Sequence, residues 1–203
     1  MKPKPNFLNR PGPVKRGLFH MFAGLSIPIA ALFLPQMVTV ISVSVVTLIF
    51  LLIEVLRWKN PAVNRLFFLI FKAVLREEET SRLTGASYML IASLIAVSVF
   101  QRDIAVLALS FLAVGDPLAT IIGRHWGRRR LFGKTLEGDL ACLVSCIVVG
   151  FVFQQVGPDV PWPVILLGAL SATVAQAVSL AINDNLTIPL FAGLIMWIAE
   201  IMM

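Results

Sequence analysis

Charged residues are scarce in this chain of 203 residues: Asp, Glu, Lys and Arg make up 14%, whereas 58% of residues are apolar and the mean hydropathy is +0.89. Soluble domains carry about 25% charged residues, so this composition excludes an ordinary soluble domain. The apolar residues also come in long runs. The chain is therefore predicted to be an all-α, polytopic integral membrane protein, a helix bundle within the bilayer.

Cysteine is nearly absent, and the two that occur, Cys142 and Cys146, fall inside one apolar run. Residues four apart share a helix face, so we interpret them as packing residues in a reducing environment and expect no disulfide framework. Basic residues outnumber acidic ones, 17 to 11. In a membrane protein this balance indicates basic loops facing the cytoplasm, so no nucleic-acid partner is expected.

Acidic residues are missing from residues 1–16, a proline-rich basic segment, and no small-residue cleavage site follows the apolar run behind it. We therefore expect a cytoplasmic basic tail rather than a signal peptide. The remainder, 17–203, is interpreted as a single transmembrane catalytic domain.

Seven apolar runs are expected to span the membrane, although the first and fifth are short for the roughly 20 residues that a bilayer requires. They lie at 17–35, 37–58, 83–100, 104–122, 140–156 and 163–182, and in the segment that follows residues 183–189 to the end of the chain. The segment 61–76 differs, because Arg65, Lys72 and Arg76 fall within about 40° of one another on a helical wheel. It is predicted to be an amphipathic helix in the interface.

Placing the amino terminus in the cytoplasm puts every lysine and arginine except Arg102 on the inner side, as the positive-inside rule expects. Any chemistry should then use cytoplasmic substrates at the membrane surface. The membrane would be the inner membrane of a prokaryotic cell, or the endoplasmic reticulum or a plastid membrane of a eukaryotic one.

The most polar part of the chain, residues 115–139, begins near the end of the fourth expected span and continues beyond it. Asp116 precedes the first basic residue, Arg124, by a helical rise of about 12 Å, and a carboxylate at that depth in hydrocarbon indicates a functional site. Gly123 and Gly127 allow a close backbone approach or a tight turn. Cations suited to phosphate thus lie beside acids suited to a metal.

This mixture fits a nucleoside triphosphate, which brings several negative charges and Mg²⁺ and needs cations on the charge that develops during transfer. A soluble P-loop fold is excluded. Its pattern would require glycine where Arg128 stands, and no strand precedes the motif.

Three blocks of the motif, Gly115-Asp116-Pro117-x-Ala119, Gly123 with Gly127, and Lys134-Thr135-x-Glu137-Gly138, carry a family resemblance. The chain resembles the CTP-dependent lipid alcohol kinases, which comprise dolichol, phytol and farnesol kinases and the yeast-type diacylglycerol kinase, in a superfamily with the phosphatidate cytidylyltransferases. Further matching positions are His20, Glu54 with Arg57, Thr84-Gly85-Ala86 and residues 184–189. The resemblance implies phosphorylation of a membrane lipid alcohol, diacylglycerol or a polyprenol, by CTP.

The resemblance also implies roles for individual residues. The expected catalytic residues are Asp116, Lys134, Glu137, Asp184 and His20, with Asp184 or His20 accepting the proton of the lipid hydroxyl. Nucleotide binding is assigned to Gly115, Gly123, Arg124, Gly127, Arg128, Lys134, Thr135 and Gly138. Mg²⁺ is expected on Asp116 with Glu137 or Asp139. The oligomeric state is left open, with a homodimer among the alternatives.

Other interpretations compete with these. Cytidylyl transfer to phosphatidate is the sister chemistry, but its Lys-Asp pair, His-Gly-Gly and paired carboxyl-terminal aspartates are absent here. A transporter would show internal repeats and midplane charges, which this chain lacks. For single residues, Arg128, Arg129 and Arg130 could be only a positive-inside anchor. Glu54 with Arg57 could be only an ion pair at the end of the second span.

The charge asymmetry predicts the labelling of introduced cysteines. A cysteine near Lys134 should react with a membrane-impermeant reagent only from the cytoplasmic side, and one in the 156–161 loop only from outside. The unmodified protein, whose two cysteines lie in an apolar run, supplies the background. Labelling of both positions from one side would contradict the gathering of the site residues at one face.

Overall fold

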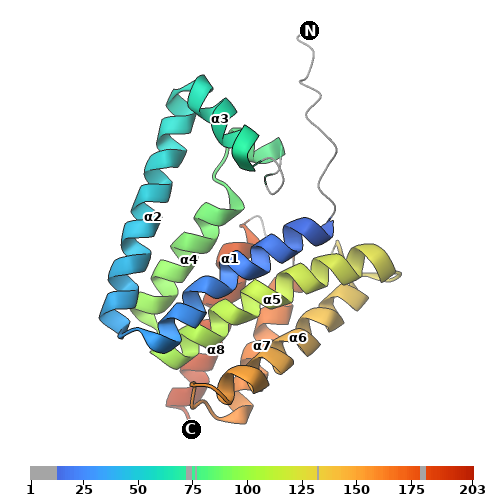
Figure 1. Cartoon of the computed structure of the whole chain (residues 1–203). Helices are drawn as coiled ribbons and strands as arrows, with labels where there is room; N and C mark the ends of the chain where they lie inside the picture. The colour runs from blue at the N-terminus through green and yellow to red at the C-terminus, as the bar shows by residue number, and fades with distance from the viewer. Residues whose placement is uncertain (1–12, 72–74, 76, 132, 179–181) are drawn as a thin grey trace.

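The computed structural model describes residues 13–71, 75, 77–131, 133–178 and 182–203 (Figure 1). Within this part of the chain, eight α-helices follow one another: α1 Pro13–Phe33, α2 Gln36–Lys59, α3 Pro61–Phe71, α4 Gly85–Val99, α5 Arg102–Trp126, α6 Leu136–Gln154, α7 Trp162–Ala177 and α8 Asp184–Ile201. A short 3-10 helix, Glu77–Thr80, precedes α4, and a hairpin of β1, Arg130–Leu131, with β2, Lys134–Thr135, precedes α6. The all-α membrane bundle is confirmed, with this hairpin as an addition.

Each of the seven expected spans corresponds to one helix, and the expected interfacial segment corresponds to α3. Five helices are long and apolar enough to cross a membrane: α1, α2, α5, α6 and α8. The short helices are α4 and α7, with 15 and 16 residues. The first and fifth runs, which were expected to be short, correspond to the longer helices α1 and α6. Residues 1–12 of the basic tail, and Lys72 and Arg76 of the amphipathic segment, lie outside the described residues.

Two helix ends differ from the apolar runs that predicted them. Helix α5 continues through Gly123 to Trp126, because a basic last turn is stabilised by the negative end of the helix dipole even though it is polar. Helix α7 ends at Ala177, with extended backbone at Val178, whereas the apolar run extends to Ile182. Hydropathy marks where a chain is buried, not where its helical hydrogen bonding stops.

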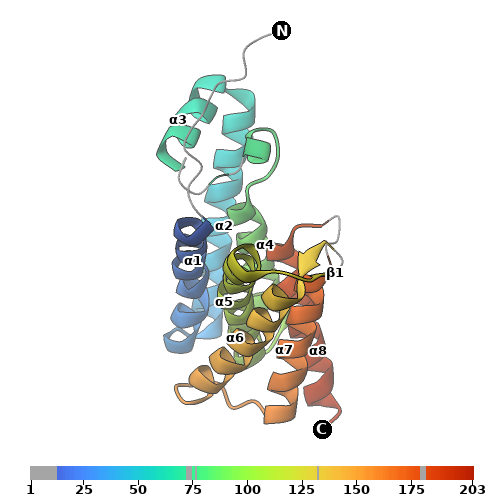
Figure 2. The same cartoon turned by 90° about the vertical axis from the view of Figure 1, so that its right-hand side faces the viewer.

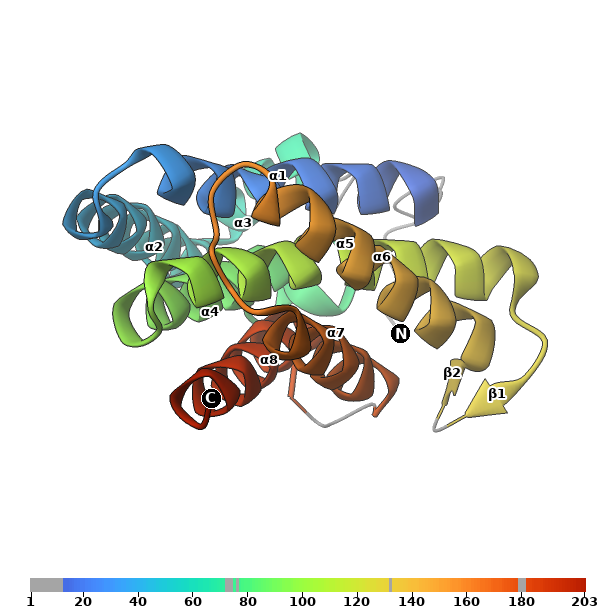
Figure 3. The same cartoon turned by 90° about the horizontal axis from the view of Figure 1, so that it is seen from below.

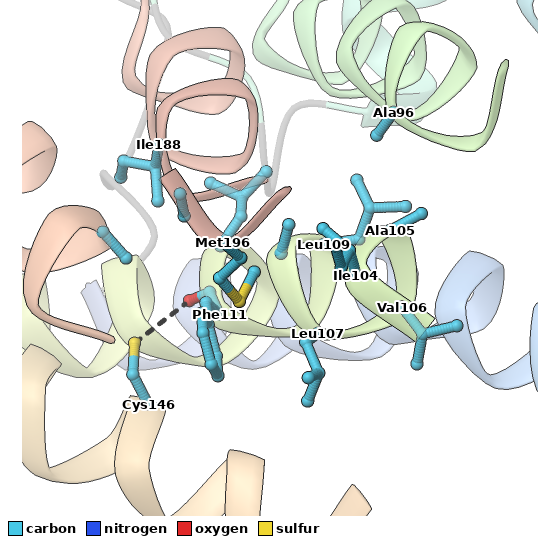
Figure 4. Packing of buried hydrophobic residues seen from close by; sticks show 14 of the residues in the cluster. Ala96, Ile104, Ala105, Val106, Leu107, Leu109, Phe111, Cys146, Ile188 and Met196 are labelled. Atoms are coloured by element: carbon cyan, nitrogen blue, oxygen red, sulfur yellow. Dashed lines mark hydrogen bonds between the residues drawn. The ribbon is translucent and has the colours of Figure 1, made fainter. Parts of the chain in front are cut away.

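Helix α5 is the centre of the bundle. Seen from below, α4 and α5 lie between α1 on one side and α7 with α8 on the other (Figure 3). The first half of α5 is buried on every side, from Ile104 to Ala113. Figure 4 shows Phe111 of this helix packed between Met196 of α8 and Cys146 of α6. A helix that is apolar all round is the expected core of such a bundle.

Small residues allow the helices to approach closely, which is the usual basis of helix association in lipid. A side chain at Gly150 would collide with Ile165, and one at Gly193 with Phe100. Both cysteines are free and buried, and their sulfurs lie 2.9–3.0 Å from where Gly115 would carry a Cβ. Their interpretation as packing residues is confirmed.

One end of the bundle is tied together by two adjacent residues at the start of α5. Arg102 donates hydrogen bonds to the carbonyls of Ala31 and Leu32 at the end of α1. The carboxylate of Asp103 accepts from the Asp159 N–H, in the loop between α6 and α7, at 3.2 Å. Helix order places these contacts at the end opposite the hairpin.

A buried ion pair fastens α2 to the loop before α4. Glu54 and Arg57 are each 1% exposed and bonded to one another. Glu54 also accepts three hydrogen bonds of 2.6–3.0 Å, from the Thr84 backbone N–H, the Thr84 hydroxyl and the Ser87 hydroxyl. Arg57 donates to the Glu79 and Arg82 carbonyls at 2.8 and 2.5 Å. The contacts support the structural alternative for this pair, since both partners are used within the protein.

Replacing Arg57 with methionine should destabilise the protein by about 3–5 kcal/mol, the usual cost of leaving one charge of a buried pair without its partner. Lys59→Met, at an exposed position near the end of the same helix, is the matched control and should have little effect. The measurement is thermal unfolding of the detergent-solubilised protein. Equal melting temperatures for the two variants would show that Glu54 does not depend on Arg57.

Candidate active site

A polar cavity of about 970 Å³ lies where α1, α4, α6 and α8 begin and α5 ends. Its volume is in the range of small-molecule sites, roughly 300–1,000 Å³. The wall carries five cationic side chains, from Arg16, Arg82, Arg124, Arg130 and Lys134. It also carries His20 and three carboxylates, from Glu79, Asp116 and Asp184. Such a surface suits an anion that brings a cation with it.

Most of the residues predicted from sequence line this one cavity, although they come from four helices and the hairpin. Of the expected catalytic residues, Asp116, Lys134, Asp184 and His20 are in the wall. Of the expected nucleotide-binding residues, Gly123, Arg124, Gly127, Lys134, Thr135 and Gly138 are in the wall. Gly115, Arg128, Glu137 and Asp139 are not among the lining residues.

The glycines of the motif bring α5 and α6 into contact at the cavity. A Cβ on Gly138 would lie 2.7 Å from the Ala119 carbonyl, and one on Gly123 would overlap the Thr135 hydroxyl. Thr135 is the N-cap of α6, and its side chain accepts from the Gly138 N–H. Of the two alternatives for Gly123, close approach is therefore the one observed.

The hairpin between α5 and α6 presents Lys134 to the cavity. Leu131 pairs with Lys134, and Arg130 with Thr135, so the turn holds Gly133, whose φ is 89°. Glycine adopts this left-handed conformation without strain. Figure 2 shows the hairpin at the same end of the bundle as the start of α6. The strands were not predicted, because each is only two residues long, too short to show the alternation of polar and apolar residues that marks a strand.

Lys134 forms a salt bridge with Asp184, with 2.8 Å between Nζ and Oδ2. Asp184 is the first residue of α8, where the helix dipole favours a negative charge. The neighbouring Asn185 donates to the Gly85 carbonyl at 2.7 Å, which joins the start of α8 to the start of α4. The bridge therefore connects the central motif to the carboxyl-terminal block across 50 residues of sequence.

The other two acids within residues 115–139, Glu137 and Asp139, are not among the residues that line the cavity. Glu137 accepts from the Arg129 backbone N–H through both oxygens, at 3.3 and 3.4 Å, and so holds the loop that follows α5. Asp139 is 6% exposed. Neither of its oxygens has a hydrogen-bond partner among the residues that the structure describes.

No group of three or more His, Cys, Asp or Glu side chains in the described ranges is arranged to hold a metal ion. Asp116, Glu137 and Asp139 are thus not assembled as a threefold cluster. The expected pairing of Asp116 with one of the other two stays a prediction.

Several lining residues were not predicted as site residues: Arg16, Glu79, Arg82, Tyr88, Gln176 and Asn185. They belong to α1, to the segment before α4, and to α4, α7 and α8, far from the motif in sequence. Two signals could have indicated some of them. Tyr88 is the only tyrosine in the chain, and Asn185 lies inside a block that was already singled out.

Comparison with known proteins connects this geometry to a family. CTP-dependent diacylglycerol kinase 1 of Schizosaccharomyces pombe is 28% identical over 71% of this chain and 73% of the kinase. "Probable phytol kinase 2, chloroplastic" of Glycine max is 31% identical over 66% of this chain. An uncharacterized protein of Rickettsia prowazekii is 28% identical over 87% of this chain and 89% of that protein.

The named relatives are CTP-dependent diacylglycerol kinases and probable phytol kinases, so the chain is similar to the CTP-dependent lipid alcohol kinase family. Those relatives are named as kinases, that is, as phosphotransferases. The match covers 52% of the soybean protein, so the chain spans about half the length of that relative. No family model and no solved structure matches the chain.

The similarity to this family and the lining of the cavity together make Asp116 the residue to test first. Asp116→Asn keeps the shape of the side chain and removes its charge, so turnover should fall at least about a hundredfold, as for loss of a major electrostatic group. Membrane insertion should be retained, because the change lowers the cost of burial.

Asp103→Asn is the matched control, since it removes a carboxylate from the opposite end of the same helix. Turnover by purified protein and yield in the membrane fraction are the two measurements. Near-normal turnover of Asp116→Asn would mean that this carboxylate is structural.

Proposed function

We propose that the protein transfers the γ-phosphoryl group of CTP to the hydroxyl of a membrane lipid alcohol, diacylglycerol or an isoprenoid alcohol, at the cytoplasmic membrane face. The Lys134–Asp184 salt bridge carries the proposal, because it joins a phosphate-binding cation to a candidate base within the cavity that Asp116 also lines. The names of the relatives support CTP as donor and a lipid alcohol as acceptor.

The cationic wall is suited to the triphosphate. Arg124 and Arg130 line the cavity from the end of α5 and from the hairpin, and arginine binds phosphate through paired N–H donors. Gly123, Gly127 and Gly138 line the same wall, where their lack of side chains lets the end of α5, the hairpin and the start of α6 pack closely. Binding of the nucleotide is thus assigned to the end of α5, the hairpin and the start of α6.

The residues present fit magnesium without a threefold cluster, because Asp116 lines the cavity and Mg²⁺ is usually held by one or two carboxylates and substrate phosphates. Asp116 would hold the ion. The buried Asp139, whose oxygens have no hydrogen-bond partner among the described residues, is the second candidate. When bound, the ion would neutralise charge on the phosphates.

Lys134 has two successive roles, one before and one after the nucleotide binds. Without nucleotide it neutralises Asp184; when phosphates enter, they compete for the same ammonium group, and Asp184 becomes available to the acceptor. The lipid hydroxyl oxygen then forms a bond to the γ-phosphorus, the bond from that phosphorus to the β-bridging oxygen breaks, and CDP leaves. The hydroxyl proton passes to the Asp184 carboxylate, or to His20 on the adjacent wall. Lys134 stabilises the charge on the transferred group.

The cytoplasmic assignment rests on charge. The described basic residues, apart from Arg102, lie at or near the cavity end of the bundle, and the positive-inside rule places that end in the cytoplasm. The membrane itself is left as the inner membrane of a prokaryote, or the endoplasmic reticulum or plastid membrane of a eukaryote.

Labelled CTP tests the reaction. We expect CTP labelled at the γ-phosphorus to mark the lipid product and CTP labelled at the α-phosphorus to leave it unmarked, with release of CDP. The assay uses purified protein, Mg²⁺ and a panel of diacylglycerols and isoprenoid alcohols. Lipid label from the α position, with pyrophosphate release, would overturn the kinase proposal in favour of cytidylyl transfer.

The same assay separates the roles of Lys134 and Asp184. Lys134→Met should weaken CTP binding, whereas Asp184→Asn should retain CTP binding and lose transfer. Asp159→Asn, in the loop at the opposite end, is the control for removal of a carboxylate. Normal transfer by Asp184→Asn would move the base to another residue of the wall.

A further inference from the structure

A second cavity, of about 420 Å³, lies between α1, α2, α3 and α4. Its wall is mostly apolar, and one side is formed by Phe19, Ala23, Ile27 and Ala30 of α1 and by Leu34 directly after this helix. Their spacing of three or four residues keeps them on one helix face. Val43, Val46 and Phe50 of α2 and Met89 of α4 face them. We call this cavity the apolar groove.

The groove is long and follows α1. Lining residues extend from Arg16 to Leu34, a helical rise of about 27 Å, which nearly equals the roughly 30 Å hydrocarbon core of a bilayer. Figure 1 shows α1 and α2 meeting at one end and diverging toward the other. The lining residues thus follow an elongated path, which suits an extended chain better than a compact ring.

Three hydroxyls along the groove are already used within the protein. Ser26 donates to the Ala23 carbonyl at 2.7 Å, Thr39 to the Pro35 carbonyl at 3.3 Å, and Thr84 to Glu54 at 2.8 Å. Satisfied hydroxyls gain little from a polar ligand. The wall thus favours methylene groups over polar ones.

At its polar end the groove opens into the cavity of the active site. Five residues line both spaces: Arg16, His20, Glu79, Gly85 and Asn185. A ligand whose apolar chain follows α1 would therefore have its polar end among these residues, next to Asp184 and Lys134. Continuity of an apolar channel with a phosphate-binding wall is what a lipid alcohol requires.

We propose that the apolar groove between α1 and α2 holds one hydrocarbon chain of the acceptor lipid, with the reacting hydroxyl at the junction formed by Arg16, His20, Glu79, Gly85 and Asn185. The identity of the chain as that of an acceptor alcohol rests on the proposed function. The groove specifies two further features of that function, namely where the acceptor lies and which helices select its chain.

Photocrosslinking with the wild-type protein tests the position. The probe is a lipid alcohol that carries a diazirine near the middle of one chain, irradiated in the presence and absence of excess unlabelled alcohol. Crosslinks should map to groove residues such as Ala30 and Val46 and should be reduced by the competitor. Crosslinks confined to outward-facing residues of the same helices, such as Phe22 and Leu48, which are 76% and 60% exposed, would overturn the proposal.

Substitution tests the selection. Ala30→Trp places a large side chain in the groove and should lower kcat/KM for long-chain acceptors about tenfold, as overpacking of a filled site would. Activity on short-chain acceptors and the KM for CTP should be unchanged. Ile29→Trp is the matched control, because Ile29 is the neighbouring residue, is 44% exposed and does not line the groove.

The two proposals fail differently. If the wild-type protein transfers no γ-label to any alcohol, the proposed function fails. If it does transfer label, but the Ala30→Trp and Ile29→Trp variants have the same chain-length profile, the groove is not the acceptor site. If Ala30→Trp does not fold, the crosslinking map with the wild-type protein decides.

Discussion

The close contact of α5 with α6 at Gly123 and Gly138 is the constraint on which the active site depends. It leaves no room for side chains between the helices, so the short connection folds back as a hairpin and carries Lys134 to the mouth of the cavity. From there the lysine reaches Asp184 of α8. A single interhelical approach thus determines where the motif meets a block 50 residues away.

Much of this arrangement could be predicted from sequence, because membrane burial leaves a strong signal. Seven apolar runs predicted seven helices, and an isolated acid at depth predicted that Asp116 lines a site. Resemblance to a family supplied Lys134, Asp184 and His20, which periodicity alone does not distinguish from surface charges.

The remainder depended on three-dimensional contacts that no local pattern encodes. The ends of α5 and α7 are set by hydrogen bonding, and apolar runs do not mark them. Glu137 and Asp139 were expected beside Lys134 as candidate metal ligands, yet neither is among the residues that line the cavity. Glu79 and Arg82 reach that wall because Glu54 and Arg57, on another helix, hold the loop that contains them.

The pair Arg102-Asp103 has a consequence for how rigidity is distributed. Arg102 binds the end of α1, and Asp103 binds the loop between α6 and α7. Two adjacent residues thus hold the start of α5, the end of α1 and this loop together. Regions with more such ties open at a higher free-energy cost than regions with fewer. The short connection between α1 and α2 lies at this same end, so spreading of α1 from α2 is easier at the opposite end, where the groove meets the active site and a lipid headgroup would pass.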